Sequence, residues 1–112
     1  VVDNRTNLMW QDDADANTIK RTWSDAITYC EDLTLATHSD WRLPNKNELK
    51  SIVDRSKVNP AMSEVFQNRV ISTYWSSTTY AGDSTTAWYV SFSSGDDRIN
   101  AKTNTHYVRC VR

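Results

Sequence analysis

With 112 residues, 11% of them aromatic and only two glycines and two prolines, the chain lies outside the disordered and fibrous classes and predicts one domain over residues 1–112. The net charge of −1 at pH 7 excludes nucleic acid as the expected partner, because the chain lacks the cationic excess that counterion release requires. No apolar run approaches the about 20 residues that cross a bilayer, so we expect no membrane span.

The first 21 residues predict a short strand or hairpin followed by an exposed loop. In residues 1–10 an apolar pair and Leu8-Met9-Trp10 flank a polar turn, which is typical of a hairpin or an edge strand. Residues 11–21 are polar and acidic, as expected of a loop. Asp12, Asp13 and Asp15 alternate as the ligands of a calcium loop do, but the glycine and the distal glutamate of such a loop are missing.

Two helices are predicted next along the chain. The first begins at Thr22, which resembles a capping box with Asp25 three residues later. The second follows Pro44, with Asn45 as its cap and Glu48 at the third helical position. The apolar residues of each helix fall on one face: Trp23, Ala26, Ile27, Cys30 and Leu33 in the first, and Leu49, Ile52 and Val53 in the second.

The segment between the helices, Asp40-Trp41-Arg42-Leu43-Pro44, predicts structure rather than catalysis. We expect Asp40 and Arg42 to form a buried or half-buried ion pair, with Trp41 and Leu43 packed inward. Breaking such a pair on one side costs about 3–5 kcal/mol, so Arg42 is expected to be a folding residue. Arg109 and Arg112 allow a structural role or a surface contact.

The rest of the chain predicts an irregular stretch and then strands. Residues 55–72 are irregular, with Pro60, Met62, Val65 and Phe66 as expected core plugs. Strands are predicted at 74–78, 88–93, 98–101 and 106–111, and in the second of these Trp88, Val90 and Phe92 alternate with polar residues. Two early helices followed by an antiparallel sheet, with the chain ends brought together, predict the α+β class.

The two cysteines, Cys30 and Cys110, fit no metal motif, even when His38 and His106 are counted. A structural disulfide is the leading interpretation, and two buried free thiols or one reactive thiol are the alternatives. The disulfide would tie the last strand to the first helix. Because such bonds persist outside the cytosol, it favours a secreted or cell-surface protein, and a periplasmic protein is also possible.

Six motifs in order along the chain resemble the bacterial extracellular domain family named for the C-terminal domain of the Legionella collagen-like protein. They are Asp3-Asn4-Arg5-Thr6 with Leu8-Met9-Trp10, Thr22-Trp23-Ser24-Asp25-Ala26 leading to Tyr29-Cys30, Asp40-Trp41-Arg42-Leu43-Pro44 with Glu48-Leu49, Tyr74-Trp75-Ser76-Ser77-Thr78, Ala87-Trp88-Tyr89-Val90, and Tyr107-Val108-Arg109-Cys110-Val111-Arg112.

The resemblance implies a C-type-lectin-like fold, with two helices packed on a small twisted antiparallel sheet with long loops. It is related to the fold of formylglycine-generating enzymes. Such domains sit on secreted or lipid-anchored bacterial proteins that serve adhesion or recognition, and the named relative binds sulfated glycosaminoglycans on a trimeric collagen-like stalk. This chain is slightly acidic and has no collagen repeat, so an oligomer would form through a parent protein.

Two polar stretches are the candidate ligand-binding region, because binding residues concentrate in loops on a rigid scaffold. They are residues 78–86 and 96–106, which the resemblance implies lie near each other. The candidate ligand residues are Tyr80, Asp83, Ser84, Asp96, Asp97, Arg98, Asn100, Lys102, Asn104 and His106.

Plain solvent-exposed loops and a metal held by Asp96, Asp97 and Asn100 are the alternatives for this region. The sugar-and-calcium motifs of animal C-type lectins are absent, and we expect no bound metal. Acids outnumber bases in these loops, and the basic Lys46, Lys50, Arg55 and Lys57 are expected away from them.

The leading hypothesis is therefore an extracellular, non-catalytic recognition or adhesion module that binds a glycan or a host or cell-surface protein, and uses no cofactor. A structural cap of a larger surface protein, without a ligand, is the second hypothesis. A formylglycine-generating-type oxidase is the third, although no nucleophile elbow or phosphate loop is present and both cysteines are expected in the disulfide.

Overall fold

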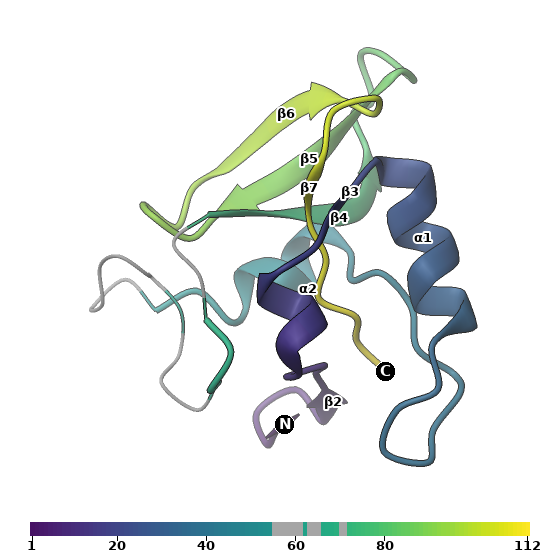
Figure 1. Cartoon of the computed structure of the whole chain (residues 1–112). Helices are drawn as coiled ribbons and strands as arrows, with labels where there is room; N and C mark the ends of the chain where they lie inside the picture. Colours follow the sequence, from purple (N-terminus) through teal and green to yellow (C-terminus); the bar gives the residue numbers. More distant parts are fainter. Residues whose placement is uncertain (55–61, 63–65, 70–71) are drawn as a thin grey trace.

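The computed structural model describes residues 1–54, 62, 66–69 and 72–112 (Figure 1). Its strands are β1 (Val2–Asp3), β2 (Leu8–Met9), β3 (Lys20–Arg21), β4 (Thr73–Thr79), β5 (Thr86–Ser91), β6 (Asp97–Ala101) and β7 (His106–Tyr107). Its helices are α1 (Trp23–Asp32), α2 (Lys46–Lys50) and the short 3₁₀ helix η1 (Ala14–Asn17). The predicted α+β class is confirmed. None of the described helices is both long and apolar enough to cross a membrane.

The main sheet has five strands in the order β3-β7-β4-β5-β6, and β1 and β2 form a separate antiparallel pair. Most pairs are antiparallel, but β7 runs parallel to β4, with Tyr107 opposite Tyr74. The expectation of a purely antiparallel sheet is wrong in this detail. Apolar alternation reports which residues share a face of a strand, and it carries no information on the direction of the neighbouring strand.

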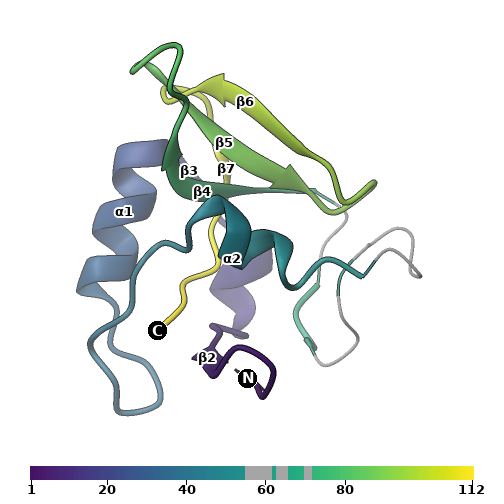
Figure 2. The same cartoon turned by 180° about the vertical axis from the view of Figure 1, so that it is seen from behind.

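The C-terminal segment passes through the middle of the molecule and ends beside the N-terminal strand pair (Figures 1 and 2). Only His106 and Tyr107 of the predicted strand 106–111 pair within the main sheet. Val111 forms isolated bridges to Trp10 and Arg42 instead. The two ends of the chain therefore lie together, as the sequence predicted.

Two buried clusters form the core on the two sides of the sheet. The first surrounds α2: Trp10, Leu49, Ile52, Met62, Phe66, Tyr74, Val90, Phe92 and Val111. The second surrounds the disulfide: Ala26, Cys30, Trp41, Leu43, Trp75, Ala87, Val108 and Cys110. The inward packing of Trp41 and Leu43 and the plug roles of Met62 and Phe66 are confirmed, whereas Pro60 and Val65 lie outside the described residues.

The start of α1 is held by tertiary contacts rather than by the predicted capping box. Thr22 is the N-cap residue, but its side chain makes no capping hydrogen bond, so that prediction is wrong. The backbone N–H of Trp23 donates to the carbonyl oxygen of Lys102 at 3.1 Å, and its indole Nε1 donates to that of Ser76 at 2.9 Å. These two bonds fix the first turn against the sheet.

The predicted start of α2 is confirmed, although the helix is only five residues long. The Asn45 side chain accepts from the Glu48 backbone N–H at 2.8 Å, and the Glu48 carboxylate accepts from the Asn45 N–H at 2.9 Å. This reciprocal capping box satisfies two N–H groups that a helix start otherwise leaves unpaired. Ile52 lies beyond the helix end and is still buried.

The predicted ion pair between Asp40 and Arg42 is wrong. Arg42 makes a two-pronged bond to Glu48, with nitrogen–oxygen distances of 2.6 and 2.7 Å, and Asp40 pairs with Arg112. The bridge between Arg42 and Val111 brings Arg112 beside Asp40, a long-range contact that the local motif does not reveal. Since the Arg42 side chain is 48% exposed, its pair contributes at most about 1 kcal/mol, so Arg42 is not a buried folding residue.

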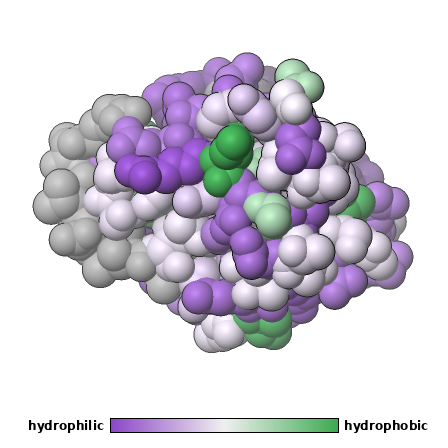
Figure 3. Space-filling view, turned by 90° about the horizontal axis from the view of Figure 1, so that it is seen from above, coloured by the Kyte–Doolittle hydropathy of each residue, from purple (hydrophilic) through white to green (hydrophobic). Residues whose placement is uncertain are grey.

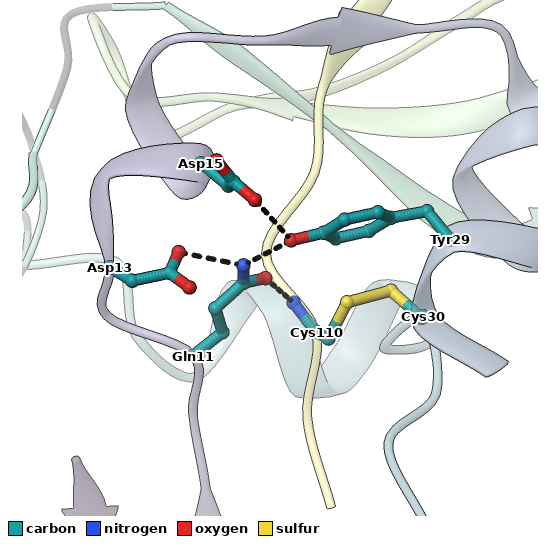
Figure 4. Close-up of a disulfide and its surroundings, with 6 residues drawn as sticks. All are labelled: Gln11, Asp13, Asp15, Tyr29, Cys30 and Cys110. Atoms are coloured by element: carbon teal, nitrogen blue, oxygen red, sulfur yellow. Dashed lines mark hydrogen bonds between the residues drawn. A yellow bond between two sulfur atoms is a disulfide. The ribbon is translucent and has the colours of Figure 1, made fainter. Parts of the chain in front are cut away.

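Residues 11–21 are more ordered and more buried than the predicted loop, because they contain η1 and β3. Gln11 is fully buried: its Oε1 accepts from the Cys110 backbone N–H, and its Nε2 donates to Asp13 and to the Tyr29 hydroxyl (Figure 4). Tyr29 in turn donates to Asp15. The Asp13 and Asp15 carboxylates thus accept hydrogen bonds from protein side chains, and these contacts do not support a calcium-binding loop.

The predicted disulfide between Cys30 and Cys110 is confirmed, with a Cα–Cα distance of 5.6 Å (Figure 4). Both cysteines are fully buried. The bond joins α1 to the C-terminal segment across 80 residues of chain. Cross-linking positions so far apart restricts the unfolded chain and stabilises the fold.

Reduction of the disulfide should lower the melting temperature by about 8 °C or more, because loss of such a bond costs about 2–5 kcal/mol. Calorimetry with and without reductant measures the shift. The double variant Cys30→Ser/Cys110→Ser is the control: it should melt near the reduced protein and ignore reductant. Two readily alkylated thiols in the folded, unreduced protein would contradict the assignment.

Candidate functional site

Five of the predicted ligand residues gather at one end of the sheet. The β4–β5 loop carries Tyr80, Asp83 and Ser84, and the β6–β7 loop carries Lys102 and Asn104. The backbone N–H of Lys102 donates to the carbonyl oxygen of Thr85 at 2.9 Å, which joins the two loops. Figure 1 shows both loops at the same upper end of the sheet. We call these five residues the loop-end surface.

The β4–β5 loop is held by its own hydrogen bonds. Asp83 Oδ1 accepts from the Thr85 N–H at 2.9 Å and from the Thr85 hydroxyl at 2.7 Å, and these bonds hold the pKa of Asp83 below its usual value. A Cβ atom at Gly82 would lie 2.7 Å from the Tyr80 ring, so only glycine lets the ring lie against the loop. These contacts therefore hold the β4–β5 loop in one conformation.

Lys102 connects the loop-end surface to α1. Its ammonium donates to the Thr79 hydroxyl at 3.0 Å and lies 3.9 Å from the centre of the Trp23 ring. Stacking of a cation on a tryptophan face stabilises both groups by roughly 0.5–1 kcal/mol at exposed sites. Thr79 lies in the predicted stretch 78–86, although it was not among the candidate ligand residues. The sequence did not single out Trp23 for this site, because it is brought there by a contact between residues far apart in the chain.

Asp96 and Asp97 lie at the opposite end of the β5–β6 hairpin from the loop-end surface. The register pairs Asp97 with Val90, whereas Ala101 pairs with Thr86 next to the loops. The expectation that residues 78–86 and 96–106 form one surface is therefore wrong for these two acids. A five-residue strand separates them from the loop end, at about 3.3 Å per residue.

Asp97 faces α2, where its carboxylate lies 3.5 Å from the ammonium groups of both Lys46 and Lys50. Partial burial acts to raise its pKa, but the ammonium groups of Lys50 and Lys46 keep the pKa of Asp97 below its usual value. The expectation that these lysines lie away from all the candidate residues is wrong, because the strand turns Asp97 toward the helix. Arg55 and Lys57 lie outside the described residues.

A metal held by Asp96, Asp97 and Asn100 does not fit the sheet geometry. Asp97 and Asn100 are three positions apart on one strand, so their side chains point to opposite faces. Asp97 contacts α2, whereas the Asn100 amide contacts His106. Within the ranges that the structure describes, no three His, Cys, Asp or Glu side chains come together at a possible metal site.

His106 and Asn100 form a buried support beneath the β6–β7 loop. Because Asn100 Oδ1 accepts from the Ala101 backbone N–H, the Asn100 amide nitrogen faces His106 Nε2 at 3.0 Å. His106 Nε2 must then be the acceptor, so the proton lies on Nδ1, which faces the Thr73 hydroxyl. The imidazole is 7% exposed and therefore supports the loop rather than facing a ligand.

The same Asn100 Oδ1 accepts from the exposed Asn104 amide at 2.6 Å, which links the support to the loop-end surface. The His106 ring stacks on Tyr89, with centroids 4.4 Å apart. Arg98, opposite Tyr89 in the register, is exposed on the edge strand beside this pair. Asn100 and His106 thus support the predicted ligand residue Asn104. Arg98 lies in β6, between the loop-end surface and Asp97.

Two hollows lie elsewhere on the molecule. One of about 500 Å³ is lined by residues 1–5, Trp10, 51–54 and Phe66, and another of about 330 Å³ lies beside Trp41. None of the predicted ligand residues lines either of them. Figure 3, which views the molecule from the side of β6 and the loops, shows a mainly hydrophilic surface with small, separate hydrophobic spots. The candidate site is therefore an open polar surface.

Stability should fall between pH 6.5 and about 4.5 because of His106. Burial, aided by the nearby Lys20 ammonium, lowers the pKa of His106 from 6.5 to about 4. The unfolded chain binds a proton in this range and the folded protein does not, so acid favours unfolding by up to about 1.4 kcal/mol per pH unit. Carboxylates with lowered pKa lose their stabilisation mainly at lower pH.

Urea unfolding across this range measures the effect, with His106→Gln as the comparison. Glutamine can keep a polar contact to Asn100 without titrating, so the variant should show a flatter profile. A wild-type profile as flat as that of the variant would contradict the burial of a neutral imidazole.

A comparison with curated proteins finds no match to this chain. The model of the family described as the Lcl C-terminal domain matches residues 1–112, which is the whole chain. This is the family that the six ordered motifs resemble. The chain therefore belongs to the Lcl C-terminal domain family.

Proposed function

We propose that this chain is an extracellular recognition or adhesion module that binds a glycan or protein ligand through the loop-end surface and performs no catalysis. One observation carries the proposal: two polar loops, far apart in sequence, meet at one end of the sheet and are joined by the bond from Lys102 to Thr85. Loops fixed on a rigid scaffold are the usual place of binding residues.

The loop-end surface offers both donors and acceptors of hydrogen bonds. Both bonds from Thr85 fall on Asp83 Oδ1, and within the described residues Oδ2 and the Ser84 hydroxyl have no hydrogen-bond donor or acceptor. The ammonium of Lys102 donates one hydrogen bond and keeps further N–H groups for a ligand. Such a mixture suits the hydroxyls of a glycan or the backbone groups of a protein.

The disulfide and the family support an extracellular location, on the model of the C-terminal domain of a collagen-like surface protein. A C-type-lectin-like fold remains our assignment within the α+β class, on the basis of the family. Both cysteines of the chain are in the disulfide, so the chemistry of a formylglycine-generating oxidase would have no thiol to use. This supports a binding domain over an oxidase of that type.

The proposal predicts that the triple variant Asp83→Asn/Ser84→Ala/Asn104→Ala binds its ligand at least about tenfold more weakly. Three lost hydrogen bonds of about 0.5–1.5 kcal/mol each account for such a change. Asparagine at position 83 keeps the oxygen that accepts from Thr85, so the loop should stay folded. A glycan array and a surface-protein array identify the ligand, and titration calorimetry measures the affinity.

The matched control is Asp32→Ala/Ser39→Ala/Asn47→Ala, which removes three exposed side chains outside both loops. Its affinity should equal that of the wild type. Equal losses in both variants would contradict a site at the loop end. The absence of any ligand on both arrays would favour a structural cap.

Heparin should be retained weakly, with elution below about 0.3 M salt, because ionic contacts to sulfated chains need a cluster of cations. At the loop-end surface Lys102 is balanced by Asp83, and Lys46 and Lys50 share Asp97. Heparin chromatography tests this. Stronger retention that is lost in Arg98→Ala/Lys102→Ala but kept in Lys46→Ala/Lys50→Ala would contradict it.

A further inference from the structure

Trp88 differs from the other four tryptophans in its indole N–H group. The indoles of Trp23, Trp41 and Trp75 donate to backbone carbonyl oxygens, and that of Trp10 is buried. The Trp88 nitrogen is neither buried nor hydrogen-bonded within the described residues. A tryptophan whose N–H group reaches solvent can use both its ring and its donor toward a ligand.

The position at which α2 begins explains why Trp88 is left partly open. Trp88 and Val90 share a face of β5, and Val90 belongs to the same buried cluster as Leu49 of the helix. The helix begins at Lys46, whose flexible side chain extends over the Trp88 ring with its ammonium 4.2 Å from the ring centre. Figure 2 shows α2 against β4 and β5, with β6 lying further out.

Side chains of three kinds surround the indole. The Tyr80 ring approaches edge-on, with centroids 5.8 Å apart and an interplanar angle of 74°. Ile99 lies opposite Trp88 in the register and is 42% exposed. We call Tyr80, Trp88, Ile99 and Lys46 the Trp88 platform. Because Tyr80 belongs also to the loop-end surface, one ligand can contact both.

The charges beside the platform favour a neutral ligand. The Lys46 ammonium lies between the Trp88 ring and the Asp97 carboxylate, which Lys50 also contacts at 3.5 Å. An anionic ligand here would meet the Asp97 carboxylate as well as the ammonium. An N–H donor, an ammonium and a carboxylate around an aromatic ring instead match a sugar, whose hydroxyls both donate and accept.

The size of the platform favours a glycan over a protein. A stable protein interface covers about 800 Å² on each partner and has an apolar centre. Among the exposed large hydrophobic side chains of the described residues, only Ile99 belongs to the platform. One aromatic ring with polar groups at its rim matches the area of a single sugar ring.

We propose that Trp88, with Tyr80 and Lys46 beside it, is the stacking platform for a neutral pyranose of a glycan that also contacts the loop-end surface. The inference rests on the proposed function and narrows its ligand to a glycan. The apolar face of the pyranose would take the place of the Lys46 ammonium on the face of the indole. Its hydroxyls would accept from the indole N–H group and bond to the displaced Lys46 ammonium and to Asp97.

Nuclear magnetic resonance of the ¹⁵N-labelled protein tests the platform directly. The five indole N–H signals are recorded, and the signal missing in Trp88→Phe identifies Trp88. The probes are methyl β-D-galactopyranoside, methyl β-D-glucopyranoside and N-acetyl-D-glucosamine, with D-glucuronate as the charged comparison. The Trp88 signal should move with at least one neutral probe and less with glucuronate, while the other four stay in place.

Affinity for the same neutral probe separates the ring from its donor. Trp88→Phe keeps an aromatic ring and loses the N–H group, so binding should weaken about 2- to 10-fold. Trp88→Ala should abolish measurable binding. The control Ile19→Ala removes another exposed isoleucine and should change nothing. An unchanged melting temperature in Trp88→Phe shows that its effect is not unfolding.

Different failures separate this inference from the proposed function. A glycan whose affinity falls in Asp83→Asn/Ser84→Ala/Asn104→Ala but not in Trp88→Phe or Trp88→Ala would overturn the platform and keep the recognition module. A protein as the sole ligand, or movement of the Trp88 signal only with glucuronate, would also overturn the neutral-sugar assignment. No ligand on either array would overturn both proposals.

Discussion

The disulfide from Cys30 to Cys110 fixes the C-terminal segment in the interior of the protein, and the other parts are arranged around that segment. Gln11 accepts from the Cys110 backbone N–H and binds Tyr29 of α1 and Asp13, so the segment before β3 depends on the same centre (Figure 4). Strand β7 pairs on both sides, with β3 and β4. A break at this position would release α1, β3 and the sheet together.

Arg109, the neighbour of Cys110, shows how such a central segment tolerates a buried charge. Its guanidinium is fully buried, donates to the carbonyl oxygens of Gln11 and Asn68, and lies 3.4 Å from the Asp12 carboxylate. Asp12 also accepts from the N–H groups of Gln67 and Asn68 and thereby holds the segment 66–69 in place. A buried charge is costly unless it is paired and hydrogen-bonded, and most of these requirements are met here.

The sequence predicted the features that depend on local patterns. Apolar spacing placed both helices, the capping box placed the start of α2, alternation placed β5, and the two cysteines gave the disulfide. The sequence did not predict ion pairs between residues that only folding brings together. Arg42 pairs with Glu48, and Asp40 pairs with Arg112. For the candidate site, five of the polar residues named from the sequence lie together in loops at one end of the sheet, but strand register separated Asp96 and Asp97 from them, and His106 is buried.

Trp88, which we propose as a ligand residue, was not predicted from the sequence for a related reason. Its alternation with Tyr89 predicted an inward side chain, and the strand face is indeed the one that α2 covers. How far a helix covers a sheet depends on where it begins and ends. Because α2 begins at Lys46, Val90 is buried in the cluster that contains Leu49, whereas Trp88 is half-open beside the Lys46 side chain. Burial along one strand is therefore decided by the neighbouring element.

The stiffness of the proposed binding region would have a consequence for affinity. Each ordered side chain that must be immobilised on binding costs about 0.5–1.5 kcal/mol, so prior order in the free protein favours the complex. The bonds within the β4–β5 loop, the Tyr80 ring against Gly82, and the Asn100 support of Asn104 supply that order before any ligand arrives. An open surface that buries little of a sugar needs this advantage, because it gains less from excluded water than a deep pocket does. In the proposed site, the rigid loops on a cross-linked core thus reduce the entropy cost of binding. This reduction offsets the small gain from excluded water at a shallow polar surface.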